Sequence, residues 1–194
     1  MGRPQAFDSP TAIRRARDVF WSQGFESTSL PDLEAATGLR RSSLYHAFES
    51  KRGLFDATVA NYLDEVIAPL LAPLQQDQVS SGAVETYLLA LRASVGSTSG
   101  RSGCLLLRAA ASPIGQEADV GAIVAGYRRD LTTALARGVA ARHPGIDAGA
   151  AAHLASIITA LVVTAMTLAP VDREAAVAAI DTARGVNASG VDSA

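Results

Sequence analysis

Cysteine, lysine and aromatic residues are scarce in this sequence. Its 194 residues include one cysteine and one lysine, and 5% of them are aromatic. A single cysteine excludes a disulfide framework and a thiolate metal cage within one chain, and it fits a reducing, cytoplasmic compartment. Residues 1–4 lack the apolar run of a secretion signal. Charged residues reach 19% against 48% hydrophobic, so the chain has enough apolar surface to fold rather than remain disordered.

Long apolar runs are also few. The most apolar stretch covers residues 154–171 and lacks a basic flank. About 18 residues make only a marginal membrane span. We therefore expect a helix buried in a protein interface, and no membrane partner.

Alanine, in contrast, is abundant, with 38 residues. It loses no side-chain entropy on entering a helix, so this composition predicts an all-α fold. A linking helix is expected from near Lys51 to Leu70, and Pro69 must kink or end it because its ring displaces the backbone bond to Glu65. Apolar spacing and end signals predict further helices over residues 10–23, 30–37, 41–47, 80–97, 103–112, 117–142, 147–168 and 172–185.

Charge is distributed unevenly along the chain. Residues 1–55 hold eight basic and six acidic side chains, whereas the remainder holds nine basic and thirteen acidic ones. A basic head on an acidic body orients a molecule towards a polyanion. A difference in net charge this small is common by chance, and alone it does not indicate a nucleic-acid partner.

Two short helical segments follow the first helix. Ser29 and Asp32 form a capping box at the start of one, and Gly38 ends it after about eight residues. In the next, Leu44 and Phe48 point to the core and leave polar side chains on the other face. Two short helices joined by a glycine-containing turn are the geometry of a helix-turn-helix.

The exposed face of the second short helix carries chemistry suited to DNA. The helix fits the major groove, where the planar guanidinium of Arg41 can grip a guanine edge with two bonds. Ser42 and Ser43 have side chains short enough to let the helix backbone approach the DNA. Tyr45 and His46 can reach flanking phosphates, which fix register without reading sequence. The alternatives are a packing role for Tyr45 and simple solvation for His46.

Lys51 follows Ser50 at the start of the next helix. Its ammonium and the helix's own N–H groups could hold one phosphate together. Arg14, Arg15 and Arg17 are expected to form a solvated face of the first helix rather than to contact DNA.

These motifs resemble the N-terminal signature of the TetR family of transcriptional regulators. The resemblance covers about residues 9–56 and rests on four runs: Thr28-Ser29-Leu30-Pro31-Asp32-Leu33, Gly38-Leu39, Ser43-Leu44-Tyr45-His46-Ala47-Phe48 and Ser50-Lys51-Arg52-Gly53-Leu54-Phe55. It implies an all-helical homodimer with small DNA-binding heads, usually a repressor of a palindromic operator that a small molecule releases. It also implies a phosphate contact at Thr28, base reading by Arg40, Arg41, Ser42 and Ser43, and backbone contacts at Tyr45, His46 and Lys51.

Two positions depart from the family pattern. Arg40 stands where many members place a Ser or Thr helix cap, and Ala47 replaces the commoner aromatic residue. Both leave the operator sequence undetermined.

The resulting domain prediction has three parts. Residues 1–52 are expected to form the helix-turn-helix domain, residues 53–185 a helical ligand-binding and dimerisation domain, and residues 186–194 a disordered tail. Helices 147–168 and 172–185 are predicted to form a four-helix bundle with a second copy of the chain. The apolar band behind this prediction, which could instead be intrachain core, is Leu154, Ile157, Ile158, Leu161, Val162 and Ala165.

A ligand pocket is expected among the helices of the body. Few ionisable residues lie there, which favours an apolar or weakly polar effector. Cys104 follows Gly103 at a helix start, a setting that can make a thiol reactive, and some TetR-like regulators respond to electrophiles at a similar place; a buried, inert thiol is the alternative. The candidate lining residues are Tyr62, Tyr87, Leu88, Cys104, Leu107, Arg108 and Tyr127.

Enzymatic chemistry has little support in the sequence. The histidines His46, His143 and His153 lack metal-ligand spacing, and no nucleophile elbow occurs. We therefore predict no cofactor, no metal site and no catalytic residues. An all-helical enzyme or small-molecule binding protein without DNA binding is the alternative.

Overall fold

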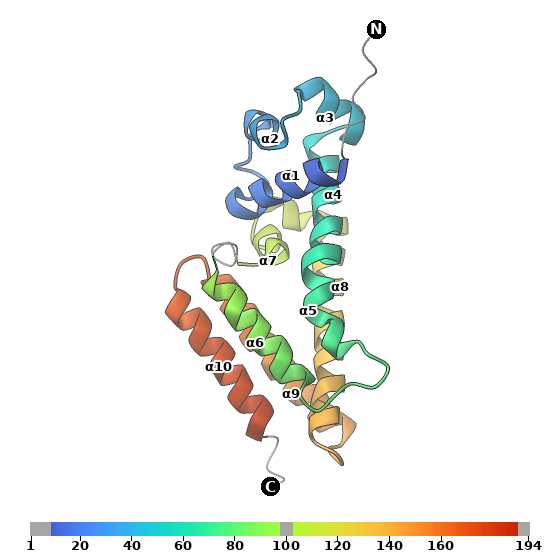
Figure 1. The fold of residues 1–194 in the computed structure, drawn as a ribbon, viewed down its shortest axis with the longest axis vertical. Coiled ribbons are helices and arrows are strands. Elements are labelled where there is room, and N and C mark those ends of the chain that lie inside the picture. Colours follow the sequence, from blue (N-terminus) through green and yellow to red (C-terminus); the bar gives the residue numbers. More distant parts are fainter. Residues whose placement is uncertain (1–8, 98–102, 190–194) are drawn as a thin grey trace. The chain divides into compact units, whose positions relative to one another are not determined.

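The computed structural model describes residues 9–97 and 103–189, and every regular element in these ranges is a helix (Figure 1). The predicted all-α fold class is thus confirmed. The chain divides into two compact units, residues 1–66 and 67–194. The linking helix therefore belongs largely to the first unit, whereas the predicted functional division lay at residues 52 and 53.

The first unit is built around an aromatic cluster. The ring of Phe55 meets those of Phe20 and Phe25 edge-on, with centroids 5.3 and 5.1 Å away. Such pairs add stabilisation beyond the area that they bury. The helices that enclose the cluster are α1 (Ser9–Gln23), α2 (Leu30–Thr37), α3 (Arg41–Phe48) and α4 (Lys51–Tyr62).

The ends of these helices follow the signals in the sequence. Gly24 and Gly38 adopt left-handed φ values of 84° and 74°, which other residues rarely adopt. The capping box of Ser29 and Asp32 is present, with each side chain bonded to the other residue's backbone N–H. The predicted start of α2 and the predicted ends of α1 and α2 are confirmed.

Pro69 was predicted to kink or to end the linking helix, and the second outcome is wrong. Helical structure continues past Pro69 through α5 (Ala68–Leu71) and the 3-10 turn η2 (Ala72–Leu74), and a π-helical turn, η1 (Leu63–Ile67), lies before it. Proline cannot donate a bond to the carbonyl four residues earlier. A π turn directly before Pro69 changes that bonding pattern, so the helical run continues.

The second unit contains the remaining helices. Their bounds agree with the predicted ones within a few residues, and α9 begins one residue later than predicted. They are α6 (Ala83–Gly96), α7 (Leu105–Ala110), the 3-10 turn η4 (Pro113–Gln116), α8 (Ala118–Arg142), α9 (Ala148–Leu168) and α10 (Arg173–Ser189).

The disordered tail was predicted to begin at residue 186, and this boundary is wrong. Residues 186–189 continue α10, and Asn187 is 1% exposed. Packing of this last turn keeps it helical despite its polar sequence. Residues 190–194 lie outside the described residues.

Helix α9 is the one described helix long and apolar enough to span a membrane by length and composition. It packs against both α8 and α10, as a core helix does. Most of the predicted dimerisation band faces this core: Leu154, Ile158, Val162 and Ala165 are buried, Leu161 is half-buried and Ile157 is exposed. The intrachain alternative is therefore correct for most of this band.

Candidate nucleic-acid interface

Helix α3 presents a polar face from a short, firmly packed helix. Leu44 is 4% exposed and anchors α3 on the first unit. The neighbouring α4 packs against α3. The structure brings six predicted DNA-contacting residues together on or beside this helix, all exposed: Arg40, Arg41, Ser42, Ser43, Tyr45 and His46.

The side chain of Arg41 is oriented by its neighbour one turn along α3. Its guanidinium carbon lies 5.4 Å from the centroid of the Tyr45 ring. This cation–π contact is worth roughly 0.5–1 kcal/mol at an exposed site. Tyr45 is 39% exposed and so is not buried in packing. The pair leaves the edge of the guanidinium accessible for a planar acceptor such as guanine.

The start of α3 is held by a residue that the sequence analysis missed. Arg40 occupies the N-cap position and makes no side-chain capping bond. Instead, the backbone N–H of Arg41 donates to Oε1 of Glu34, at 2.6 Å. Glu34 comes from α2, seven residues earlier, so no local capping pattern in the sequence identifies it.

Lys51 lies at the start of α4, as predicted. Ser50 caps this helix by accepting a bond from the Gly53 N–H at 3.0 Å. The Lys51 ammonium lies 4.4 Å from the centroid of the Phe25 ring. Burial lowers the pKa of Lys51, and the nearby Glu26 carboxylate opposes that shift. The arrangement holds a partly desolvated cation over the Phe25 ring, on the first residue of α4.

Thr28 does not fit the phosphate contact that the resemblance implies. The residue is 2% exposed, and its hydroxyl donates to the Gly24 carbonyl at 2.6 Å. That bond closes the connection between α1 and α2. The side chain of Thr28 therefore orders the turn rather than reaching a phosphate.

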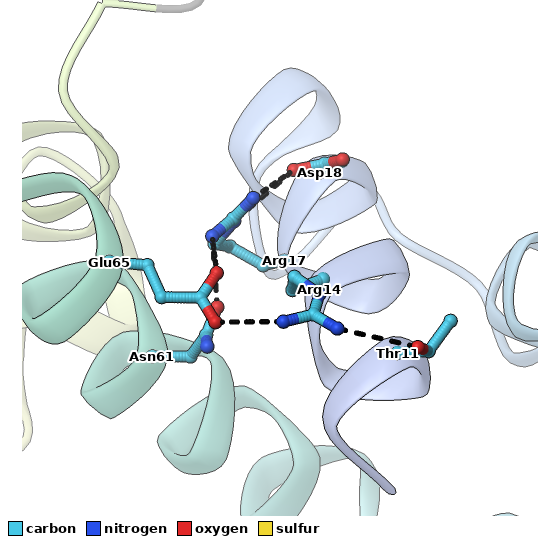
Figure 2. Close-up of polar contacts among 6 residues, drawn as sticks. All are labelled: Thr11, Arg14, Arg17, Asp18, Asn61 and Glu65. Atoms are coloured by element: carbon cyan, nitrogen blue, oxygen red, sulfur yellow. Dashed lines mark hydrogen bonds and ion pairs between the residues drawn. The ribbon is translucent and has the colours of Figure 1, made fainter. Parts of the chain in front are cut away.

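Two of the arginines predicted to form a solvated face of α1 are engaged within the first unit. Arg14 and Arg17 each bind one carboxylate oxygen of Glu65, both at 3.1 Å (Figure 2). Arg17 also donates to Oδ1 of Asn61 at 2.9 Å, and its side chain is only 13% exposed. The pKa of Glu65 is lowered, first by its hydrogen bond with Asn61 and then by the arginines. This cluster, the Glu65 clamp, ties α1 to η1.

The predicted ligand residues separate into two groups. Tyr62 lies in the first unit, with its ring edge-on to Trp21 at 5.0 Å between centroids. In the second unit, burial raises the pKa of Tyr87 and of Tyr127, and the proximity of Cys104 adds to both shifts. Tyr87, Tyr127 and Cys104 therefore gather at one place. The others named for the pocket are the buried Leu88 and the half-buried Leu107 and Arg108.

A separate cavity of about 510 Å³ lies between α6, α8 and α10. It contains none of the predicted ligand residues. Its lining is Glu85, Arg142, Asp181, Arg184, Gly185, Asn187 and Ala188. Among the residues that the structure describes, no group of three or more His, Cys, Asp or Glu side chains could hold a metal ion.

Known proteins resemble this chain both in sequence and in fold. The profile of the family described as bacterial regulatory proteins, tetR family, matches residues 12–58. The HTH-type transcriptional repressor ComR of Escherichia coli (strain K12) is 36% identical over 55% of this chain. That alignment covers 51% of ComR, so the chain spans about half the length of this curated relative.

Solved structures extend the similarity to nearly the whole chain. A TetR-family regulator from Streptomyces coelicolor shares the fold at 20% identity, covering 95% of this chain and 97% of its own, with a TM-score of 0.80. The TetR family transcriptional regulator CifR, as a cysteine mutant complexed with a 26-base-pair double-strand operator DNA, is 30% identical with a TM-score of 0.77. The alignment covers 93% of this chain and 97% of CifR. The protein therefore belongs to the TetR family of bacterial regulatory proteins, a family of regulators rather than of enzymes.

Proposed function

We propose that this protein is a transcriptional repressor that binds a palindromic DNA operator as a homodimer and leaves it when a small apolar or weakly polar molecule binds. The observation that carries the proposal is the outward face of α3. There Arg41 is oriented by Tyr45 and followed by two serines, while Leu44 is buried beneath. A catalytic helical bundle has no reason to present such a face. The DNA-bound CifR structure and the repressor ComR support the same assignment.

The proposed roles on DNA follow from the chemistry of each side chain. Arg41 reads a guanine edge with two hydrogen bonds, and Arg40, Ser42 and Ser43 line the same approach to the base edges. Tyr45, His46 and Lys51 contact phosphates, which set the register of the protein on the duplex. Thr28 has no direct contact in this scheme.

The proposed dimer uses the outward faces of α9 and α10. The exposed face of α9 carries no Asp, Glu, Lys or Arg over its 21 residues. A helix face of mainly small residues lets a second helix approach closely. Its exposed members are Ala148, Gly149, Ala152, His153, Ser156, Ile157, Ala160, Thr164 and Thr167. A two-fold dimer presents two α3 helices about 34–36 Å apart, one turn of DNA.

The proposed effector site surrounds Tyr87, Tyr127 and Cys104 in the second unit. Two phenols and a thiol among leucines suit a ligand that is mainly apolar with one or two polar atoms. An effector releases DNA only if it binds the DNA-incompatible state of the dimer more tightly than the DNA-bound state. Cys104 is 4% exposed. This burial favours a packing role over a reactive one.

Selection of bound duplexes from a random pool tests the proposal. The full-length protein is expected to enrich a palindrome whose half-sites are centred about one helical turn apart. An enriched sequence without two-fold symmetry would contradict the homodimer. Failure to retain any duplex at low salt would overturn the DNA-binding function itself, because sequence-independent electrostatic attraction to DNA is strongest there.

A further inference from the structure

The N-cap residue of helix α3 offers no side-chain acceptor to the first N–H groups of the helix. The first N–H groups of a helix have no partner inside it, and a helix of eight residues is marginal without capping. Ser, Thr, Asp and Asn usually meet this need from the N-cap position. Arg40 has no acceptor to offer, and its backbone φ and ψ of −73° and 152° are those of an ordinary N-cap. The acceptor for the first turn must therefore come from elsewhere.

Glu34 supplies it from α2. Its Oε1 atom accepts the N–H of Arg41 at 2.6 Å, and its backbone carbonyl accepts the N–H of Gly38 at 2.9 Å. One residue thus binds both ends of the connection over residues 38–40. A carboxylate at a helix N-terminus also interacts favourably with the helix dipole, and a hydrogen bond to an ionised acceptor is stronger than one to a neutral acceptor.

Arg41, whose N–H is bonded to Glu34, is also the residue that reads the base edge in the proposed function. The Glu34 bond fixes the main chain of Arg41, and the Tyr45 ring fixes its guanidinium. A bidentate contact to guanine depends on placement to within about 0.5 Å.

We propose that Glu34 is a positioning residue for DNA recognition: it caps the recognition helix from the preceding helix, compensates for Arg40 at the N-cap, and sets the approach of Arg41 to the base edge. This inference rests on the proposed DNA-binding function. It assigns to Glu34 a role that depends mainly on its acceptor oxygen, with its charge making a smaller contribution to the strength of the bond.

The test compares two substitutions at one position. Glu34→Ala removes both the acceptor and the charge, whereas Glu34→Gln keeps an acceptor oxygen and removes only the charge. Asp64→Asn is the matched control, because Asp64 is an exposed carboxylate of the first unit that lies outside the helix-turn-helix. Fluorescence anisotropy measures the affinity of each protein for the duplex selected by the wild type and for a shuffled duplex at the same salt concentration.

The ratio of the two affinities is the decisive quantity. Glu34→Ala is expected to reduce it about fivefold, the factor of a typical lost cap. Glu34→Gln and Asp64→Asn are expected to leave it within about twofold while both bind the shuffled duplex slightly more tightly, since each removes one negative charge. A loss in Glu34→Gln equal to that in Glu34→Ala overturns the capping role, as does a wild-type ratio in Glu34→Ala.

Arg40→Ser provides a rescue that a general structural role would not give. A serine at the N-cap can accept the N–H of the second or third residue of α3 and so stabilise its first turn without Glu34. Glu34→Ala is therefore expected to cost little in the Arg40→Ser background. The same fivefold loss in both backgrounds contradicts the proposal. Amide hydrogen exchange gives a readout without DNA: the Arg41 N–H is expected to exchange faster in Glu34→Ala than in Glu34→Gln. If the wild type selects no DNA, the proposed function fails, and the exchange comparison still decides whether Glu34 caps α3.

Discussion

Two cations of the first unit are held in ways that suit different contacts. Arg41 lies on the exposed face of α3, with its guanidinium against the Tyr45 ring. Lys51 lies at the start of α4, partly desolvated above the Phe25 ring. A guanidinium presents a planar edge of donors that matches guanine, whereas an ammonium is a compact point charge suited to phosphate. In the proposed function, the two residues therefore separate sequence reading from sequence-independent affinity.

Substitution of each cation by alanine distinguishes the two roles. Arg41→Ala is expected to cost about 1–3 kcal/mol on the selected duplex and much less on a shuffled one, so that base preference relaxes. Lys51→Ala is expected to weaken both duplexes alike and to reduce the salt slope of binding by about one. A gel-shift titration over several salt concentrations measures both effects. Indistinguishable profiles for the two variants contradict the assigned roles.

The Glu65 clamp predicts a pH-dependent contribution to stability. Because the hydrogen bond with Asn61 and the two arginines lower the pKa of Glu65 in the folded state, the clamp is fully present above the ordinary carboxyl pKa. Its contribution disappears as the pH falls through the lowered value. Glu65→Gln is expected to reduce the melting temperature by no more than a few degrees at pH 7, since the site is partly exposed. This difference is expected to vanish under acidic conditions.

Asp64→Asn serves as the control in the same melting experiment. Asp64 is the neighbouring exposed carboxylate in η1 and lies outside the clamp. Its variant is expected to melt like the wild type throughout the pH range. A Glu65→Gln difference that persists unchanged in acid means that the clamp stabilises by packing rather than by charge.

At the scale of single elements, capping residues and glycines in the sequence account for the helix ends at which they occur. Gly38 and the Ser29–Asp32 box determine the ends of α2 within two or three residues of sequence, and both were predictable. The helical turn over residues 186–189 and the Glu34 cap have no such local signal. They arise from packing and from bonds between elements, which a periodic pattern does not encode. Sequence reasoning therefore located α3 and its exposed face but not what holds its first turn.

The chain turns sharply in the connection between α3 and α4. Glu49 adopts a positive φ of 65°, and the Ser50 N–H donates to the Phe48 carbonyl at 2.7 Å. A hydrogen bond across two residues defines a γ-turn, which is strained for a residue other than glycine. The main chain of α4 consequently passes close under the end of α3. The resemblance marks Gly53 as part of a motif, and the structure gives the steric reason.

Gly53→Ala is expected to destabilise the first unit by about 1–3 kcal/mol. A Cβ atom at this position overlaps the Phe48 carbonyl oxygen, a main-chain atom that cannot turn aside. Gly185→Ala in α10 is the matched control, because its Cβ atom meets no atom within 4 Å. That variant is expected to gain about 0.5–1 kcal/mol from reduced chain entropy. Urea unfolding measures both, and equal effects of the two substitutions contradict the steric explanation.

At the scale of the whole molecule, the proposed DNA recognition depends on a second copy of the chain. One α3 helix of eight residues reads only a few base pairs, and the basic excess of residues 1–55 is two charges. Two linked heads multiply their affinities through effective concentration, provided that their spacing matches the duplex. In the proposed dimer, the outward face of α9, which carries no Asp, Glu, Lys or Arg, joins the two copies. The buried band of α9 packs within each chain, so the exposed face of the same helix is the one available for this proposed contact.

A charge on that exposed face is expected to separate the copies and, with them, the operator complex. Ile157 is 36% exposed on α9, so Ile157→Glu leaves the core of the chain intact. Burying an unpaired carboxylate at the proposed interface strongly opposes association. Ile157→Glu is thus expected to elute as a monomer and to bind the palindrome about 10²-fold more weakly, with affinity for a single half-site retained. Leu89→Glu, at an isomeric side chain 44% exposed on α6, is expected to remain dimeric and to bind as the wild type does. Light scattering measures the oligomeric state of both variants, and fluorescence anisotropy measures their affinity for the operator. A dimeric Ile157→Glu protein with full operator affinity would place the interface elsewhere.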